Sequence, residues 1–124
     1  MAVSCVLGVL TVVHDVDHVR QGRALPFELY GVAVLALVMV GTTLTMLVRS
    51  HPLAEGAAVV LGILTIVGVG AVHVAPEWST HADSYGAAHA DALSWAIIIA
   101  MVLAGVVLAV VAAVSHRRVT ARGG

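Results

Sequence analysis

The chain has 124 residues, of which 60% are hydrophobic and 10% are charged, with a formal net charge of −1 and a mean hydropathy of +1.05. So little polar surface cannot cover a soluble globule, whereas a helix that is apolar on all sides is stable in lipid. The near-neutral charge and the lack of a basic stripe disfavour nucleic-acid binding. We therefore expect residues 1–124 to form a single integral membrane domain in contact with the lipid bilayer.

The first apolar run, residues 1–13, is short for a membrane span. As a helix it would rise about 20 Å, against about 30 Å for the hydrocarbon core. A signal peptide of this length would begin with basic residues and end at a small-residue cleavage site, and no basic residue precedes Arg20. We expect a first span over residues 1–20, in which His14 to His18 enter the interface or the bundle interior. A helix that begins before residue 1 is the alternative.

Three further apolar runs, residues 29–48, 56–72 and 92–115, contain no charged residue and no histidine. A membrane span needs about 20 apolar residues. The run at residues 56–72 reaches that length if the span continues through His73. The four expected spans are residues 1–20, 27–48, 54–75 and 92–115.

The connections between the spans predict their arrangement. The first two are short, and Pro26 and Pro52 are well placed to open the helices that follow them. Short links place successive helices antiparallel. The third connection, from Pro76 to about Ala90, is longer. The sequence thus predicts an all-α integral membrane four-helix bundle of up-down-up-down topology, with short connections and one longer third loop.

Glycines in the second and third spans are expected to let helix backbones approach closely. Small residues are the usual packing device in membranes, because lipid removes the hydrophobic drive for helix association. The candidates are Gly41, Gly62, Gly68 and Gly70.

The arginines predict the orientation. Cytoplasmic segments carry an excess of basic residues. The side of the termini and the second connection holds Arg49, Arg117, Arg118 and Arg122, and the other side holds Arg20 and Arg23. Both termini are therefore expected in the cytoplasm. The chain has no lysine and no asparagine, whose codons are A/T-rich. That bias indicates a GC-rich bacterial genome, and hence a multi-pass protein of the bacterial inner membrane.

The side expected to be external carries six acidic residues and five of the seven histidines. It also carries every aromatic residue of the chain, Phe27, Tyr30, Trp78, Tyr85 and Trp95. We expect these aromatic side chains to form an interfacial belt that anchors the helix ends at the lipid headgroups.

The segment His14-Asp15-Val16-Asp17-His18 is the first candidate site. On a helix, His14 and His18 are four residues apart and share a face, as the two ligands of a helical metal site must. Asp15 and Asp17 each lie three residues from one histidine, so each can orient an imidazole or add an oxygen ligand. A charged turn that simply ends the span is the alternative.

The second candidate is His73, near the end of the third span. It is the histidine most expected to lie below the water interface, where an imidazole without a polar partner is costly. His14, Asp15 and Asp17 lie at a similar depth on the first helix and are its candidate partners. A structural histidine satisfied by such a partner is the alternative to a metal ligand.

The third candidate is a short repeat in the third connection, His81-Ala82-Asp83 and His89-Ala90-Asp91. The nitrogen and oxygen ligands of His81, Asp83 and His89 would suit zinc, manganese or ferrous iron. Asp91 has another interpretation, because it directly precedes the fourth span and can cap that helix.

No nucleotide-binding, zinc-protease or serine-hydrolase motif occurs in the sequence. An enzyme is therefore less expected than a non-enzymatic accessory or structural membrane component, which would form a homo-oligomer or join a membrane protein partner. The alternative function is an externally facing site for a transition metal or haem b. His14, His18 and His73 are then the first candidate ligands, since two helices presenting imidazoles at similar depth could also ligate a haem axially.

Overall fold

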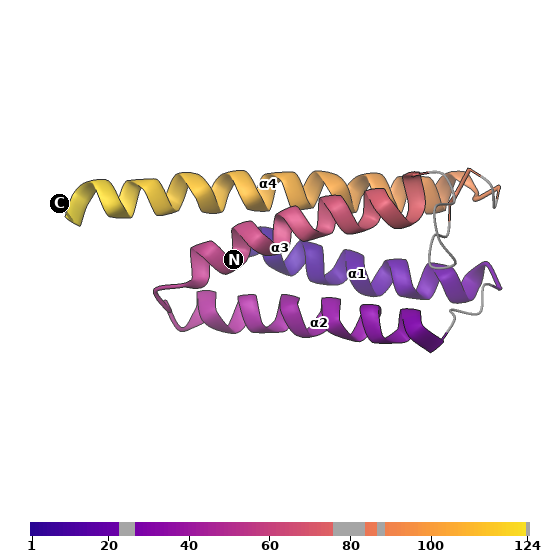
Figure 1. Cartoon of the computed structure of the whole chain (residues 1–124), viewed down its shortest axis with the longest axis horizontal. Coiled ribbons are helices and arrows are strands. Elements are labelled where there is room, and N and C mark those ends of the chain that lie inside the picture. The colour runs from indigo at the N-terminus through magenta and orange to yellow at the C-terminus, as the bar shows by residue number, and fades with distance from the viewer. Residues whose placement is uncertain (23–26, 76–83, 87–88, 124) are drawn as a thin grey trace.

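The computed structural model describes residues 1–22, 27–75, 84–86 and 89–123. Its helices are α1 (Ala2–Arg20), α2 (Phe27–Val48), α3 (Ala54–Val69) and α4 (Ala92–Gly123), and α3 continues directly into a five-residue π-helix, η1 (Gly70–Val74). Successive helices run in opposite directions, so that both chain termini lie towards the same end of the bundle (Figure 1). The predicted all-α, up-down-up-down bundle is confirmed.

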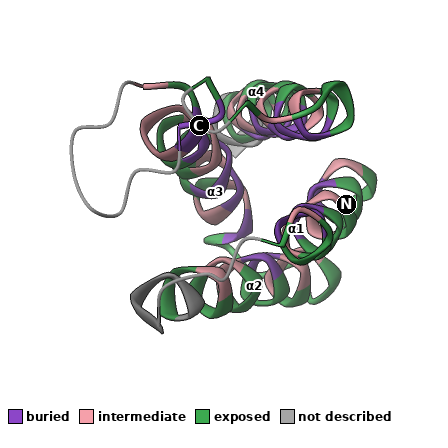
Figure 2. Ribbon diagram, turned by 90° about the vertical axis from the view of Figure 1, so that its right-hand side faces the viewer, coloured by how far each residue is buried: buried purple, intermediate pink, exposed green. Residues whose placement is uncertain are grey.

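All four helices are long and apolar enough to cross a membrane. The qualifying segments are Ala2–Arg20, Gly31–Val48, Ala54–Val74 and Ala92–Arg118. Their outward faces carry large exposed apolar side chains, such as Val9, Leu35 and Leu103, which are 58–63% exposed. Buried residues line the faces where the helices meet, and exposed residues cover the outer faces (Figure 2). An apolar outer surface on every helix is stable only against acyl chains. The chain is a small multi-pass membrane protein.

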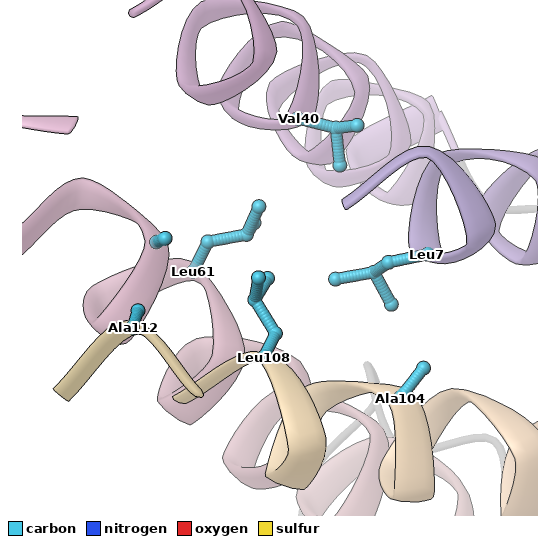
Figure 3. Close-up of a cluster of buried hydrophobic side chains, with 7 residues drawn as sticks. Leu7, Val40, Leu61, Ala104, Leu108 and Ala112 are labelled. Atoms are coloured by element: carbon cyan, nitrogen blue, oxygen red, sulfur yellow. The ribbon is translucent and has the colours of Figure 1, made fainter. Parts of the chain in front are cut away.

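The core nearer the termini joins all four helices. Leu7 of α1, Val40 of α2, Leu61 of α3 and Leu108 of α4 converge there (Figure 3). Small side chains complete the cluster, namely Ala58, Ala104 and Ala112. Leu7 and Ala58 are each only 1% exposed. This cluster fixes how the helices pack at the end of the bundle opposite to the histidines.

Close approach of α3 and α4 depends on two glycines. A Cβ atom on Gly62 would lie 2.5 Å from the carbonyl oxygen of Gly105, and one on Gly105 would lie 3.0 Å from the carbonyl oxygen of Gly62. The packing role expected for Gly62 is confirmed, and its partner Gly105 was not predicted. The same expectation is wrong for Gly41, Gly68 and Gly70, where a Cβ atom would have no described neighbour within 4 Å outside the backbone of its own helix.

Candidate metal centre

Helix α1 presents two histidines to the interior of the bundle. His14 and His18 are 9% and 3% exposed, and their Nε2 atoms lie 3.2 Å apart. The four-residue spacing puts both rings on the same helical face, as the sequence predicted. One imidazole must donate its N–H while the other accepts with a lone pair, so this contact uses one nitrogen of each ring.

His73 reaches the same place from the π-helix η1. The backbone N–H of Ala75 donates to the carbonyl oxygen of Gly70 over 2.9 Å, a bond that spans five residues. Such a turn is wider than an α-helical turn and changes the register of the residues in it, and π-turns are frequent at functional sites. His73 is buried, and its ring centroid lies 4.8 Å from that of His14 and 5.3 Å from that of His18. The predicted approach of His73 to His14 is present in the structure, and His18, which was not among its expected partners, lies beside it as well.

One ligand nitrogen from each of His14, His18 and His73 can be chosen so that all three lie within 4.8 Å of one another. We call these residues the histidine cluster. Zinc–nitrogen bonds of about 2.0–2.1 Å put two ligands of a tetrahedral ion about 3.4 Å apart. The longest of these separations would therefore have to shorten by up to about 1.4 Å for the cluster to hold one ion. In addition, Nδ1 of His14 is buried and has no hydrogen-bond partner among the described residues, and such an atom calls for a ligand or another explanation.

The two aspartates of the first candidate motif have separate environments. Asp17 is buried, and both of its carboxylate oxygens are engaged: Nε of Arg20 donates to Oδ1 and Nε2 of Gln21 donates to Oδ2, each over 2.7 Å. Asp15 is half-buried and lines a cavity beside the histidine cluster. Neither aspartate belongs to the group of converging ligand atoms found among the described residues.

Arg20 joins the end of α1 to the start of α4. One guanidinium nitrogen donates to Oδ2 of Asp91 over 2.8 Å and to Oγ of Ser94 over 3.3 Å. Asp91 caps α4, because its Oδ1 accepts the backbone N–H of Ser94 over 3.0 Å. The amide of Ser94 and then the guanidinium of Arg20 lower the pKa of the Asp91 carboxyl to about 2. The capping role expected for Asp91 is thus confirmed.

Tyr85 lies against the histidine cluster, a position that the sequence does not predict. It is only 1% exposed, and its backbone N–H donates to the carbonyl oxygen of His73 over 3.0 Å. Its ring centroid lies 4.6 Å from that of His73 and 6.2 Å from that of His18, and its ring makes an edge contact with Trp95. The prediction that Tyr85 belongs to an interfacial aromatic belt is therefore wrong, because this side chain packs inside the protein.

The candidates from the third connection do not join the histidine cluster. His81 and Asp83 lie outside the described residues. His89 is described and exposed, with a left-handed φ of 52°, and it is not part of the converging group. Asp91 serves as the helix cap.

The arrangement has a clear chemical capacity. Three buried imidazoles from two helices can offer three nitrogen ligands to one ion, and three protein ligands leave a coordination position open to another molecule. The adjoining cavity, of about 320 Å³, is lined by all three histidines. No protein-family model, curated protein or solved structure matches this chain.

Proposed function

We propose that this membrane protein binds one transition-metal ion through His14, His18 and His73. The convergence of three buried imidazoles, with ligand nitrogens within 4.8 Å of one another, carries the proposal. Imidazole suits zinc, copper, iron and nickel, and it binds them in its neutral form. Burial among helices favours the neutral ring, since a charged group at membrane depth is costly.

The ring contacts favour a single ion over haem b. Axial ligation would place the porphyrin between two imidazole rings. The ring centroids of the histidine cluster are 4.6, 4.8 and 5.3 Å apart, and two of the three pairs meet edge to face. Rings in direct contact leave no room for a macrocycle between them, whereas an ion fits at the point where their nitrogens converge.

A purely structural histidine cluster is the competing interpretation. The contact between His14 and His18 satisfies one nitrogen of each ring. It leaves Nδ1 of His14 buried and without a hydrogen bond among the described residues, which costs about 1–3 kcal/mol for a polar group that has lost contact with water. A bound ion would account for the convergence of all three rings at one point.

The proposed site lies on the external side of the bacterial inner membrane, with both termini in the cytoplasm. The arginine count supports this orientation, and Arg20, one of only two arginines on the histidine side, is paired with Asp17 and Asp91. Green fluorescent protein fused after Gly124 should fluoresce, and alkaline phosphatase fused there should be inactive. Phosphatase activity in that fusion would show that the C-terminus lies outside the cytoplasm, which is the opposite orientation.

The accessory or structural role, in a homo-oligomer or with a membrane partner, remains a prediction. The described surface is apolar on every spanning helix, and contact with lipid is enough to account for that. A metal-binding function is compatible with such a role, since either could operate inside a larger assembly.

Elemental analysis of the protein purified in mild detergent tests the metal site. We expect about one transition-metal ion per chain, since three ligands suffice for a single ion. His14→Ala, His18→Ala and His73→Ala should each lose it. His89→Asn is the matched control, because His89 is exposed and asparagine tolerates its left-handed backbone. Wild-type protein that takes up no metal, or three alanine variants that retain it, would overturn the proposal.

A further inference from the structure

A cavity of about 320 Å³ lies between α1, α2 and α3, with Met101 of α4 at its wall. Its volume falls within the range of small-molecule sites, about 300–1,000 Å³. On α3 it extends from Leu61 to Val69 and on through η1 to His73. Twelve residues of helix rise about 18 Å, so the cavity is elongated along the bundle.

The cavity opens towards lipid. Val32, Leu35 and Leu64 line it and are nevertheless 56%, 58% and 48% exposed. Gly68, which also lines it, is exposed and has no side chain to close the opening. Because these residues belong to membrane-spanning segments, their exposed sides face acyl chains. A molecule dissolved in the bilayer can reach the cavity without crossing water.

The deeper part of the cavity is apolar. Met39, Val40 and Leu61 line it at the level of the core near the termini. An alkyl or isoprenoid chain fits such walls, because burial of apolar surface there costs no hydrogen bond.

The outer part of the cavity is polar and almost uncharged. Besides the histidine cluster it contains Thr11 and Thr65, whose hydroxyls donate to backbone carbonyl oxygens four residues earlier and keep oxygen lone pairs as acceptors. Among the described residues that line the cavity, Asp15 is the only one with a carboxylate, and none is an arginine. The carboxylate of Asp15 would repel an anionic headgroup, and the bound metal ion would repel a cationic headgroup. An uncharged head with hydrogen-bonding oxygen atoms fits both.

We propose that this cavity admits from the bilayer an uncharged amphiphile, whose chain lies along α2 and α3 and whose hydroxyl or carbonyl head reaches the histidine cluster. This inference rests on the proposed metal site in two respects: the bound ion disfavours a cationic head, and the head oxygen takes the coordination position that three histidines leave open. The ligand class is therefore a lipophilic alcohol, ketone or quinone.

Two glycine variants test the cavity. Gly68→Leu places a large side chain at the cavity wall, and among the described residues no atom outside the backbone of its own helix lies within 4 Å of the added Cβ, so that the packing of α3 is not strained. Gly41→Leu is the matched control. Gly41 is also exposed in a spanning helix, and its added Cβ likewise meets no described atom within 4 Å outside its own helix backbone, but Gly41 does not line the cavity.

The probe is a photoactivatable diazirine-bearing dodecanol in lipid nanodiscs, with cross-links mapped by mass spectrometry. Labelling should concentrate on peptides of α1, α2 and α3 that line the cavity. It should fall to the level of general lipid contact in Gly68→Leu and persist in Gly41→Leu. The same chain with a carboxylate or a trimethylammonium head should label the cavity less. Equal labelling by all three heads, or labelling unchanged in Gly68→Leu, would overturn the inference.

Metal content, measured on the same samples, separates the two proposals. Gly68→Leu should keep its metal while its labelling by the probe is lost, and this result supports both the metal site and the cavity assignment. Protein that carries no metal but shows probe labelling sensitive to Gly68→Leu would overturn the metal site and leave the cavity assignment supported. Metal-loaded protein without specific labelling would overturn the cavity assignment alone.

Discussion

Substitution of Gly62 by alanine should separate α3 from α4. The new Cβ atom would lie 2.5 Å from the carbonyl oxygen of Gly105 and 2.9 Å from the backbone nitrogen of Ala109. Ordinary van der Waals contact begins at about 3.4 Å, so one backbone must move by about 1 Å, and neither neighbour is a flexible side chain. Overpacking of this kind costs about 1–3 kcal/mol.

The matched control for this prediction is Gly41→Ala. Both variants gain the same intrinsic helix propensity, about 1 kcal/mol in soluble helices, and a Cβ on Gly41 meets no described atom of another element within 4 Å. The difference in unfolding free energy between the two variants therefore isolates the overpacking, and it should be about 1–3 kcal/mol. Equilibrium unfolding in mixed micelles with increasing dodecyl sulfate, followed by circular dichroism, measures it. Equal stability of the two variants would refute the close packing of α3 on α4.

Two further predictions concern the outer end of the bundle. The pKa of Asp91 is lowered from 3.8 to about 2. The contribution of this carboxylate to stability should therefore be complete above pH 3.8 and disappear as the pH falls through about 2. The unfolding free energy of Asp91→Asn should lack this acid-dependent step. Zinc at about 100 times its Kd should raise the unfolding free energy by about 2.7 kcal/mol. That increase should persist in His89→Asn and be absent in His73→Ala, and an equal increase in both would contradict the site.

The bundle could be predicted from the sequence because long apolar runs have few other interpretations. The roles of its glycines could not. Gly62 and Gly68 lie on the same helix, yet one packs against Gly105 and the other lines a cavity. Which of them faces a neighbouring helix depends on how α3 is rotated in the bundle. Its low amphipathicity, with apolar residues on every side, gives no signal of that rotation.

The histidine cluster could be predicted in outline, and its surroundings could not. The four-residue spacing of His14 and His18 and the depth of His73 are readable from the chain. Tyr85 is not, because no periodic pattern places a residue of a connection inside the protein. The pairing of Arg20 with Asp91 joins residues 71 positions apart, and the π-turn at His73 leaves no mark in the pattern of apolar residues.

The contacts around the histidine cluster bear on whether an ion is needed to form it. Arg20 binds α1 to the start of α4, and Tyr85 joins the segment before α4 to the end of η1 through the carbonyl oxygen of His73. These contacts hold both sides of the cluster without using a ligand nitrogen of any histidine. The backbones that carry the histidines are therefore held without an ion, while the ligand nitrogens still lie up to 4.8 Å apart. An ion would then tighten an existing arrangement, so removal of metal by a chelator should lower stability and leave the helical content unchanged.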